Sequence, residues 1–193
     1  MSDLFKNRYR IKSARCFKWD YRSDAAYFIT ICVDKHDALF GKVENRKVIL
    51  SEAGKIAEKS WAEIPLHFPF IILDAFVIMP NHMHGILIID NGTHVHHQSL
   101  KSKNNDISLK CTRNDISSEF MSQISPKKGS VSTVVRSYKS SCTNKINRMN
   151  PGLNFKWQTR FYDRIIREQK SHQSIRQYIL NNPAKWDDDI FRR

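Results

Sequence analysis

Runs of apolar residues divide the chain into predicted strands and amphipathic helices. Three runs rich in β-branched and aromatic residues, 27–33, 70–79 and 82–89, are expected to be strands. The first run is apolar on both faces, which predicts a central position in a sheet. The other two are separated only by Pro80 and Asn81, so we expect them to form an antiparallel hairpin with a tight turn.

Apolar residues at helical spacing predict three helices. Ser51 is positioned to cap the first helix, and Pro65 is expected to end it. Tyr178 and Asn182 are four residues apart in the last helix, so they share one face, and Pro183 closes that helix. The three helices are expected at residues 51–64, 131–146 and 171–182.

Two further regions have strand-like composition. Residues 40–43 and 47–50 are expected to pair as a short hairpin around a turn at 44–46. Residues 157–166 return to strand-like composition after the second predicted helix.

Two histidines separated by one residue begin the second strand of the longer hairpin. Successive side chains of a strand point to opposite faces, so His82 and His84 project from the same side, close enough to hold one ion. Such a pair alone is weak evidence, because many strand histidines are only packed or exposed. The preceding turn is expected to expose this end of the strand to solvent, where a charged substrate could reach both rings.

The chain has a formal net charge of +13, and this excess of Lys and Arg favours a polyanionic partner. Nucleic acid is the first candidate and an acidic membrane surface the second. Cations interleave with aromatic residues near the N-terminus, which suits single-stranded nucleic acid, although packing of this arm on the domain explains the pattern equally well. The candidate nucleic-acid contacts are Arg8, Arg10, Arg15, Lys18, Arg136, Lys139, Arg160, Arg164 and Arg167.

Composition also bounds the organisation of the 193 residues, of which 40% are hydrophobic. Residues 91–129 contain few apolar side chains and are predicted to be a flexible polar insertion. A basic arm at 1–24, one domain formed by 25–90 and 130–187, and a C-terminal tail at 188–193 complete the expected arrangement. No apolar run approaches the ~20 residues of a membrane span, and no signal peptide is evident. We therefore expect a soluble cytoplasmic protein with no membrane association.

Two imidazoles with an amide or carboxylate oxygen are a credible open site for Mg²⁺ or Mn²⁺. A metal there could polarise a phosphodiester and stabilise the charge of an in-line displacement. A nearby tyrosine hydroxyl can act as a covalent nucleophile, and the phosphotyrosine bond conserves energy so that strands can be rejoined. A metal hydrolase that uses water would instead need a carboxylate as general base. No carboxylate lies within two residues of His82 or His84.

Three motifs, in this order, resemble the single-tyrosine HUH transposases, and among them most closely the REP-associated tyrosine transposases. The resemblance spans about residues 25–187, interrupted by the predicted insertion. Each motif alone is unspecific, whereas the combination is specific. The motifs are Met79-Pro80-Asn81-His82-Met83-His84-Gly85, Trp157-Gln158-Thr159-Arg160-Phe161-Tyr162 and Tyr178-Ile179-Leu180-Asn181-Asn182-Pro183-Ala184-Lys185.

The resemblance implies an α/β (α+β) fold, a ferredoxin-like antiparallel sheet with helices packed on it, which is the HUH endonuclease architecture. It implies a divalent-metal-dependent nickase and ligase for single-stranded, often hairpin-forming DNA, which leaves a 5′-phosphotyrosine and a free 3′-hydroxyl. By position, His82 and His84 match the metal pair and Tyr178 the nucleophile. Asn182 stands where many relatives have a metal-binding glutamine, a departure that concerns the third ligand. Both a monomer and a homodimer fit the resemblance.

Two alternatives remain open. The chain could be a domesticated protein that binds hairpin-forming or repetitive single-stranded DNA without cleaving it. Tyr138 is a rival nucleophile on a basic helix, although its position on the apolar stripe favours core packing. Tyr162, beside Phe161, is expected to pack or stack.

Overall fold

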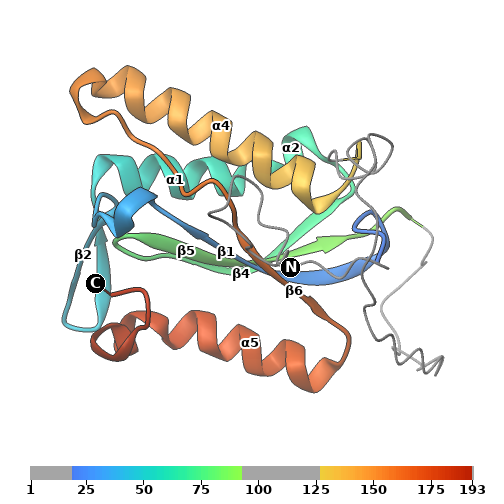
Figure 1. The fold of residues 1–193 in the computed structure, drawn as a ribbon. Helices are drawn as coiled ribbons and strands as arrows, with labels where there is room; N and C mark the ends of the chain where they lie inside the picture. Colours follow the sequence, from blue (N-terminus) through green and yellow to red (C-terminus); the bar gives the residue numbers. More distant parts are fainter. Residues whose placement is uncertain (1–18, 93–126, 193) are drawn as a thin grey trace, which may run out of the picture.

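The computed structural model of the protein describes residues 19–92 and 127–192. The four predicted contacts of the basic arm and nearly all of the predicted insertion lie outside these residues. A four-stranded antiparallel sheet with the order β4-β5-β1-β6 forms the centre of the fold (Figure 1). Its strands are β1 (Ala25–Cys32), β4 (Ile71–Ile78), β5 (His82–Ile89) and β6 (Tyr162–Ile166).

Helices cover both faces of this sheet (Figure 1). The first two long helices lie side by side on one face, and the last long helix lies on the opposite face. Strand, helix, hairpin, helix and strand follow one another in the order of a ferredoxin-like fold, so this prediction is confirmed. The long helices are α1 (Glu52–Ala62), α4 (Val131–Met149) and α5 (Gln169–Asn181).

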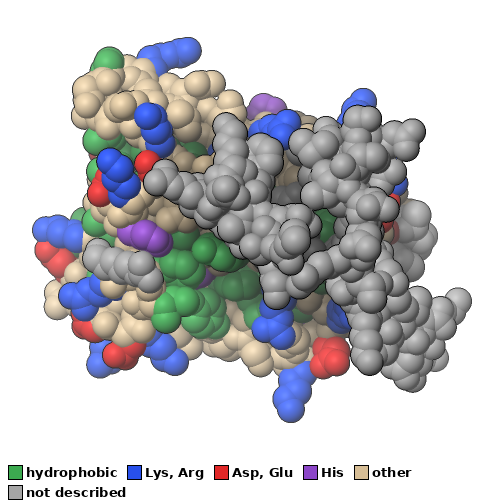
Figure 2. Space-filling view, in the orientation of Figure 1, with side chains coloured by type: hydrophobic (Ala, Val, Ile, Leu, Met, Phe, Trp, Pro, Cys, Tyr) green, Lys and Arg blue, Asp and Glu red, His purple; other side chains and the backbone are tan. Residues whose placement is uncertain are grey.

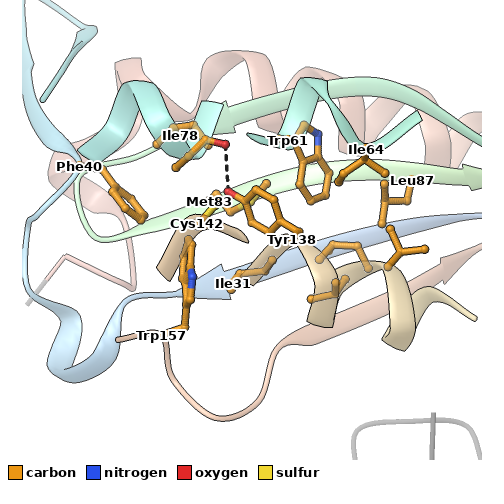
Figure 3. Close-up of a cluster of buried hydrophobic side chains, with 14 of the residues drawn as sticks. Ile31, Phe40, Trp61, Ile64, Ile78, Met83, Leu87, Tyr138, Cys142 and Trp157 are labelled. Atoms are coloured by element: carbon orange, nitrogen blue, oxygen red, sulfur yellow. Dashed lines mark hydrogen bonds between the residues drawn. The ribbon is translucent and has the colours of Figure 1, made fainter. Parts of the chain in front are cut away.

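The alternation of side chains along β5 assigns each residue to one of the two faces. Met83 and Leu87 belong to the core beneath α1 and α4, together with Trp61 and Tyr138 (Figure 3). Gly85 also points to this side, because a Cβ there would lie 2.5 Å from the indole of Trp61. The absence of a side chain lets the Trp61 ring lie directly on the strand.

The opposite face carries a smaller apolar cluster beneath α5. Ile86 of β5 and Ile166 of β6 contact Ile175 and Ile179 of the helix. These two helical residues are four apart and lie on one side of α5, so the helix buries a narrow stripe and exposes the rest. The packing holds α5 across the sheet at the level of the histidine strand.

Two sequence-based boundaries were wrong for identifiable reasons. Pro65 does not end the helical region, because it occupies the first turn of a second short helix, α2 (Ile64–His67), where a missing N–H costs nothing. Residues 157–161 form no continuous strand, and Trp157 makes only an isolated bridge to Val33. The aromatic side chain of Trp157 instead packs on Phe40 and Phe155, which explains its strand-like composition.

The remaining elements are short. The predicted hairpin of β2 (Gly41–Glu44) and β3 (Lys47–Leu50) is present as a separate two-stranded sheet. Asn45 and Arg46 both have positive φ in its turn, as type I′ hairpins require. The 3₁₀ helices are η1 (Asp34–His36), η2 (Pro151–Leu153) and η3 (Asn182–Asp188). Within the described ranges, no helix has the length and apolar character needed to cross a membrane.

Candidate active site

The histidine pair lies at the start of β5 on the face that α5 covers. His82 is fully buried and His84 is 1% exposed. The expectation that the preceding turn exposes this end of the strand was wrong, since Pro80 and Asn81 are also buried. Residues that follow α5 fold back over the turn and exclude solvent from it, as described below.

Hydrogen bonds determine which nitrogen of His82 carries its proton. The Asn81 Nδ2 group donates to the carbonyl oxygens of His36 and Phe191, at 3.2 and 2.6 Å. Its Oδ1 atom therefore faces His82 Nδ1 at 2.8 Å and must accept a hydrogen bond from the Nδ1–H group. In a neutral ring the opposite nitrogen, Nε2, then presents a lone pair.

Contacts at both ring nitrogens position His84. Its Nδ1 atom lies 2.7 Å from Thr30 Oγ1 of the neighbouring strand β1, and its Nε2 atom lies 3.1 Å from His82 Nε2. Burial lowers the pKa of His82 to about 4. Burial, followed by the neighbouring His82, lowers the pKa of His84 as well. Both rings are therefore neutral at pH 7, and two nitrogens face one point.

Tyr178 reaches this point from α5. Its hydroxyl lies 3.2 Å from His84 Nε2, and its ring packs edge-on against Phe28 of β1. The side chain remains 41% exposed, so its ring is accessible from solvent. Burial, followed by the negative charge of Asp189, raises the pKa of the Tyr178 hydroxyl. The free protein therefore holds a protonated phenol beside the histidine pair.

Asn182 is buried at the end of α5. Its Nδ2 group donates to Asp189 Oδ2 at 3.1 Å, whereas its buried Oδ1 atom has no hydrogen-bond partner in the described part of the chain. Asp189 Oδ2 lies 3.8 Å from His82 Nε2. Sequence reasoning missed this carboxylate, because the residue is 107 positions away from His82. It belongs to the predicted C-terminal tail.

The donor set suits a divalent cation. His82, His84 and Asp189 each offer one ligand atom, and these atoms lie within 4.8 Å of one another. The unpartnered Oδ1 atom of Asn182 is a further oxygen nearby. Buried polar atoms without partners are uncommon, and imidazole together with carboxylate and amide oxygens is a normal ligand set for such ions. The residues present therefore fit a divalent metal.

The same C-terminal residues cover the pair. The Phe191 ring centroid lies 4.8 Å from that of His82 and 5.9 Å from that of His84. The Trp186 ring stacks on His82 at 6.1 Å. Neither aromatic residue was considered as part of the site from the sequence.

The predicted cationic contacts differ in their surroundings. Arg164 lines a groove beside Tyr178, and Arg136 is exposed on α4. Lys139 donates to the Gln158 carbonyl oxygen at 2.5 Å and is half-buried, so its ammonium group ties two segments together. Figure 2 shows Lys and Arg side chains spread over the visible face, with hydrophobic side chains between them.

The last two predicted cations lie near β6. Arg160 is exposed just before the strand. Arg167, just after the strand, lies over the Trp19 ring at 5.6 Å. Trp19 in turn donates to the Tyr27 hydroxyl at 3.0 Å. The described end of the arm therefore packs on the domain, one of the two interpretations left open by its composition.

The rival tyrosines occupy other positions. Tyr138 is 2% exposed and donates to the Ala57 carbonyl oxygen at 3.3 Å, inside the core beneath α1 and α4. Figure 3 shows its ring between Trp61 and Trp157. Burial raises its pKa well above the usual value. Tyr162 is 57% exposed on β6 and lies near Phe191. Tyr178 alone of these three is hydrogen-bonded to the histidine pair.

A solved structure shares this architecture. The structure of a REP-associated tyrosine transposase bound to a REP hairpin matches with a TM-score of 0.51 at 19% sequence identity. The match covers 89% of this chain and 74% of that chain. The chain therefore has the fold of the tyrosine transposases, which confirms the predicted resemblance at the level of fold.

One sequence relative establishes the family. An uncharacterized protein of Haemophilus influenzae is 35% identical over 182 residues, covering 92% of this chain and 91% of the relative. The chain belongs to the same family as this Haemophilus protein. No protein-family model matches the sequence.

Proposed function

We propose that this protein is a divalent-metal-dependent nickase and strand transferase for single-stranded DNA that uses Tyr178 as its nucleophile. The observation that carries the proposal is the 3.2 Å contact between the Tyr178 hydroxyl and His84 Nε2, which itself lies 3.1 Å from His82 Nε2. A nucleophile and a buried pair of metal-binding nitrogens thus converge from two elements. The transposase fold and the basic surface are consistent with this chemistry.

In this proposal the divalent cation is Mg²⁺ or Mn²⁺, held by His82 and His84 with oxygen from Asp189 or Asn182. When bound, it would polarise the scissile phosphate and stabilise the charge of the displacement. Asn81 keeps the proton of the His82 imidazole on Nδ1 and leaves its Nε2 available, and Thr30 contacts the Nδ1 atom of His84 and orients that ring.

Tyr178 supplies the covalent step. Its oxygen forms a bond to phosphorus while the bond from phosphorus to the 3′-oxygen breaks. The phenol loses its proton and the leaving 3′-oxygen gains one, so the products are a 5′-phosphotyrosine and a free 3′-hydroxyl. Attack by a second 3′-hydroxyl on the phosphotyrosine reverses these changes and joins the strands. Arg164, in the groove beside Tyr178, is placed to contact a strand phosphate.

The test is covalent capture of labelled single-stranded hairpin DNA taken from sequence that flanks the gene, with Mg²⁺ or Mn²⁺ present. The wild type should form a protein–DNA adduct, and Tyr178→Phe should form none. Tyr138→Phe is the matched control, because it removes the hydroxyl of a core tyrosine and should leave the adduct in place.

Other outcomes would overturn the proposal. Cleavage without an adduct would mean that water attacks, and Asp189 is a carboxylate near enough to serve that mechanism. Hairpin binding without cleavage on any flanking sequence would favour a domesticated DNA-binding protein. An adduct that survives Tyr178→Phe would place the nucleophile elsewhere.

A further inference from the structure

Phe191 lies at the centre of a group of rings beside the histidine pair. Its ring centroid is 6.3 Å from that of His36, in a stacked arrangement, and 6.3 Å from that of Tyr162. The distances to His82 and His84 are 4.8 and 5.9 Å. Four aromatic or imidazole rings therefore surround one planar side chain.

The surrounding rings come from the folded domain and not from the segment that carries Phe191. His36 belongs to η1, and Tyr162 begins β6. Lys35 and His36 both have positive φ, at 55° and 60°. Non-glycine residues adopt this conformation at an energetic cost, and such residues concentrate at functional sites. The imidazole of His36 thus lies beside the site on a backbone segment in an unfavourable conformation.

The surroundings of the Phe191 ring also include polar groups that a phenyl ring cannot hydrogen-bond. His36 Nδ1 is buried and has no hydrogen-bond partner within the described residues. Its Nε2 atom lies 3.0 Å from Gln158 Nε2, so the side-chain amide of Gln158 lies beside the same imidazole ring. A buried unpartnered nitrogen beside a stacking surface suits a planar ligand that carries hydrogen-bonding groups.

The C-terminal segment that carries Phe191 resembles a nucleotide in two respects. Asp189 places a carboxylate 3.8 Å from His82 Nε2, and Phe191, two residues later, places a ring between His36 and Tyr162. A negative charge and a planar ring thus occupy adjoining positions beside Tyr178. Single-stranded DNA presents a phosphate and a base in the same way, and bases stack on aromatic side chains.

We propose that the space occupied by the Phe191 ring is a binding subsite for one unpaired base of single-stranded DNA, and that the C-terminal segment competes with that base. The subsite consists of His36, Gln158 and Tyr162, next to the histidine pair. The proposal rests on the proposed function for the class of ligand but not for catalysis. DNA entry then requires the Phe191 ring to leave.

Equilibrium binding in a Tyr178→Phe background tests this proposal without cleavage. The probe is the flanking hairpin DNA, with 2-aminopurine placed at one unpaired position at a time. Phe191→Ala should tighten binding roughly tenfold, because the base no longer has to displace a stacked ring, and the stacking of one ring changes affinity by about that factor. Fluorescence quenching should increase at one position of the probe. Tyr162→Ala should weaken binding and reduce quenching at that same position.

Ile190→Ala is the matched control, since Ile190 lies between Asp189 and Phe191 but is 77% exposed. It should leave affinity unchanged. Phe191→Tyr keeps the ring and should retain wild-type affinity, which separates competition from any loss of folding in Phe191→Ala. Unchanged or weaker binding by Phe191→Ala, or quenching that does not depend on Tyr162, would overturn the subsite. A missing covalent adduct would count only against the proposed strand transfer, because affinity is measured independently of it.

Discussion

Strand β5 contributes different kinds of side chain to the two faces of the central sheet. On the side of α1 and α4, Met83 and Leu87 enter a continuous apolar core. On the side of α5, His82 and His84 occupy positions at the end of a much smaller apolar cluster. Because side chains alternate along the strand, neighbouring residues of β5 belong to the apolar core on one face and to the candidate site on the other.

The tyrosines repeat this contrast. Tyr138 belongs to the larger core, where its hydroxyl is bonded to a backbone carbonyl group and its ring contacts Trp61 edge-on at 5.2 Å. Tyr178 lies on the other face, half-exposed, with its hydroxyl at an imidazole nitrogen. A tyrosine whose environment is closed on all sides contributes packing, whereas one at a polar, partly open edge is available for reaction.

The largest expected effect tests the face that α1 and α4 cover. Gly85→Ala should destabilise the fold by about 3 kcal/mol, because the new Cβ would lie 2.5 Å from the buried Trp61 ring. Gly152→Ala is the control, since the nearest atom to its Cβ is 3.6 Å away. Its effect should stay within about 0.5 kcal/mol. Chemical denaturation measures both, and equal stabilities would show that the Trp61 ring moves freely.

A smaller effect tests the histidine face through pH. The folded-state pKa of His82, about 4, lies below its ordinary value of 6.5. The unfolded chain therefore binds this proton first as the pH falls, and stability is lost between these values. Between pH 7 and pH 4.5, in the presence of chelator, His82 should account for a loss of roughly 2 kcal/mol.

Chemical denaturation of His82→Gln at both pH values should show a loss of unfolding free energy that is roughly 2 kcal/mol smaller than the loss in the wild type. His67→Gln, at an exposed histidine of α2, is the control and should behave like the wild type. The same pH dependence in all three proteins would mean that the histidine face is open to water.

The smallest effect distinguishes cations of the two faces. Arg164→Gln should reduce the slope of log affinity against log salt concentration by about 0.7 for single-stranded DNA, as one lost phosphate contact predicts. Arg148, exposed on α4 across the sheet, provides the control. Salt titrations with a labelled oligonucleotide measure both slopes. An equal change in the two variants would show that the groove beside Tyr178 has no special place in binding.

Local patterns were sufficient for most elements of the fold. The bounds of β5 agree with the predicted 82–89, and α4 begins at the predicted residue 131. These segments have strong periodicity, so propensity and packing favour the same structure. The failures at Pro65 and Trp157 occur where one side chain is compatible with two local structures, and packing against neighbours selected between them.

The candidate site was only partly predictable for a related reason. His82 and His84 are two residues apart, and Tyr178 and Asn182 are four apart, so strand and helix geometry bring each pair together locally. Asp189 has no such relation to any of them. It is one of three consecutive aspartates, and spacing along the chain gives no reason to select it over Asp187 or Asp188.

The sequence by itself determined which side chains share a strand face or a helix face, because those relations depend on fixed backbone periods. It thereby specified the histidine pair on a strand and Tyr178 on a helix. Only the tertiary structure decided that the pair is buried and that Asp189 and Phe191 complete and cover it. These contacts join positions more than 100 residues apart, and they arise because the residues after η3 lie against the turn that precedes β5.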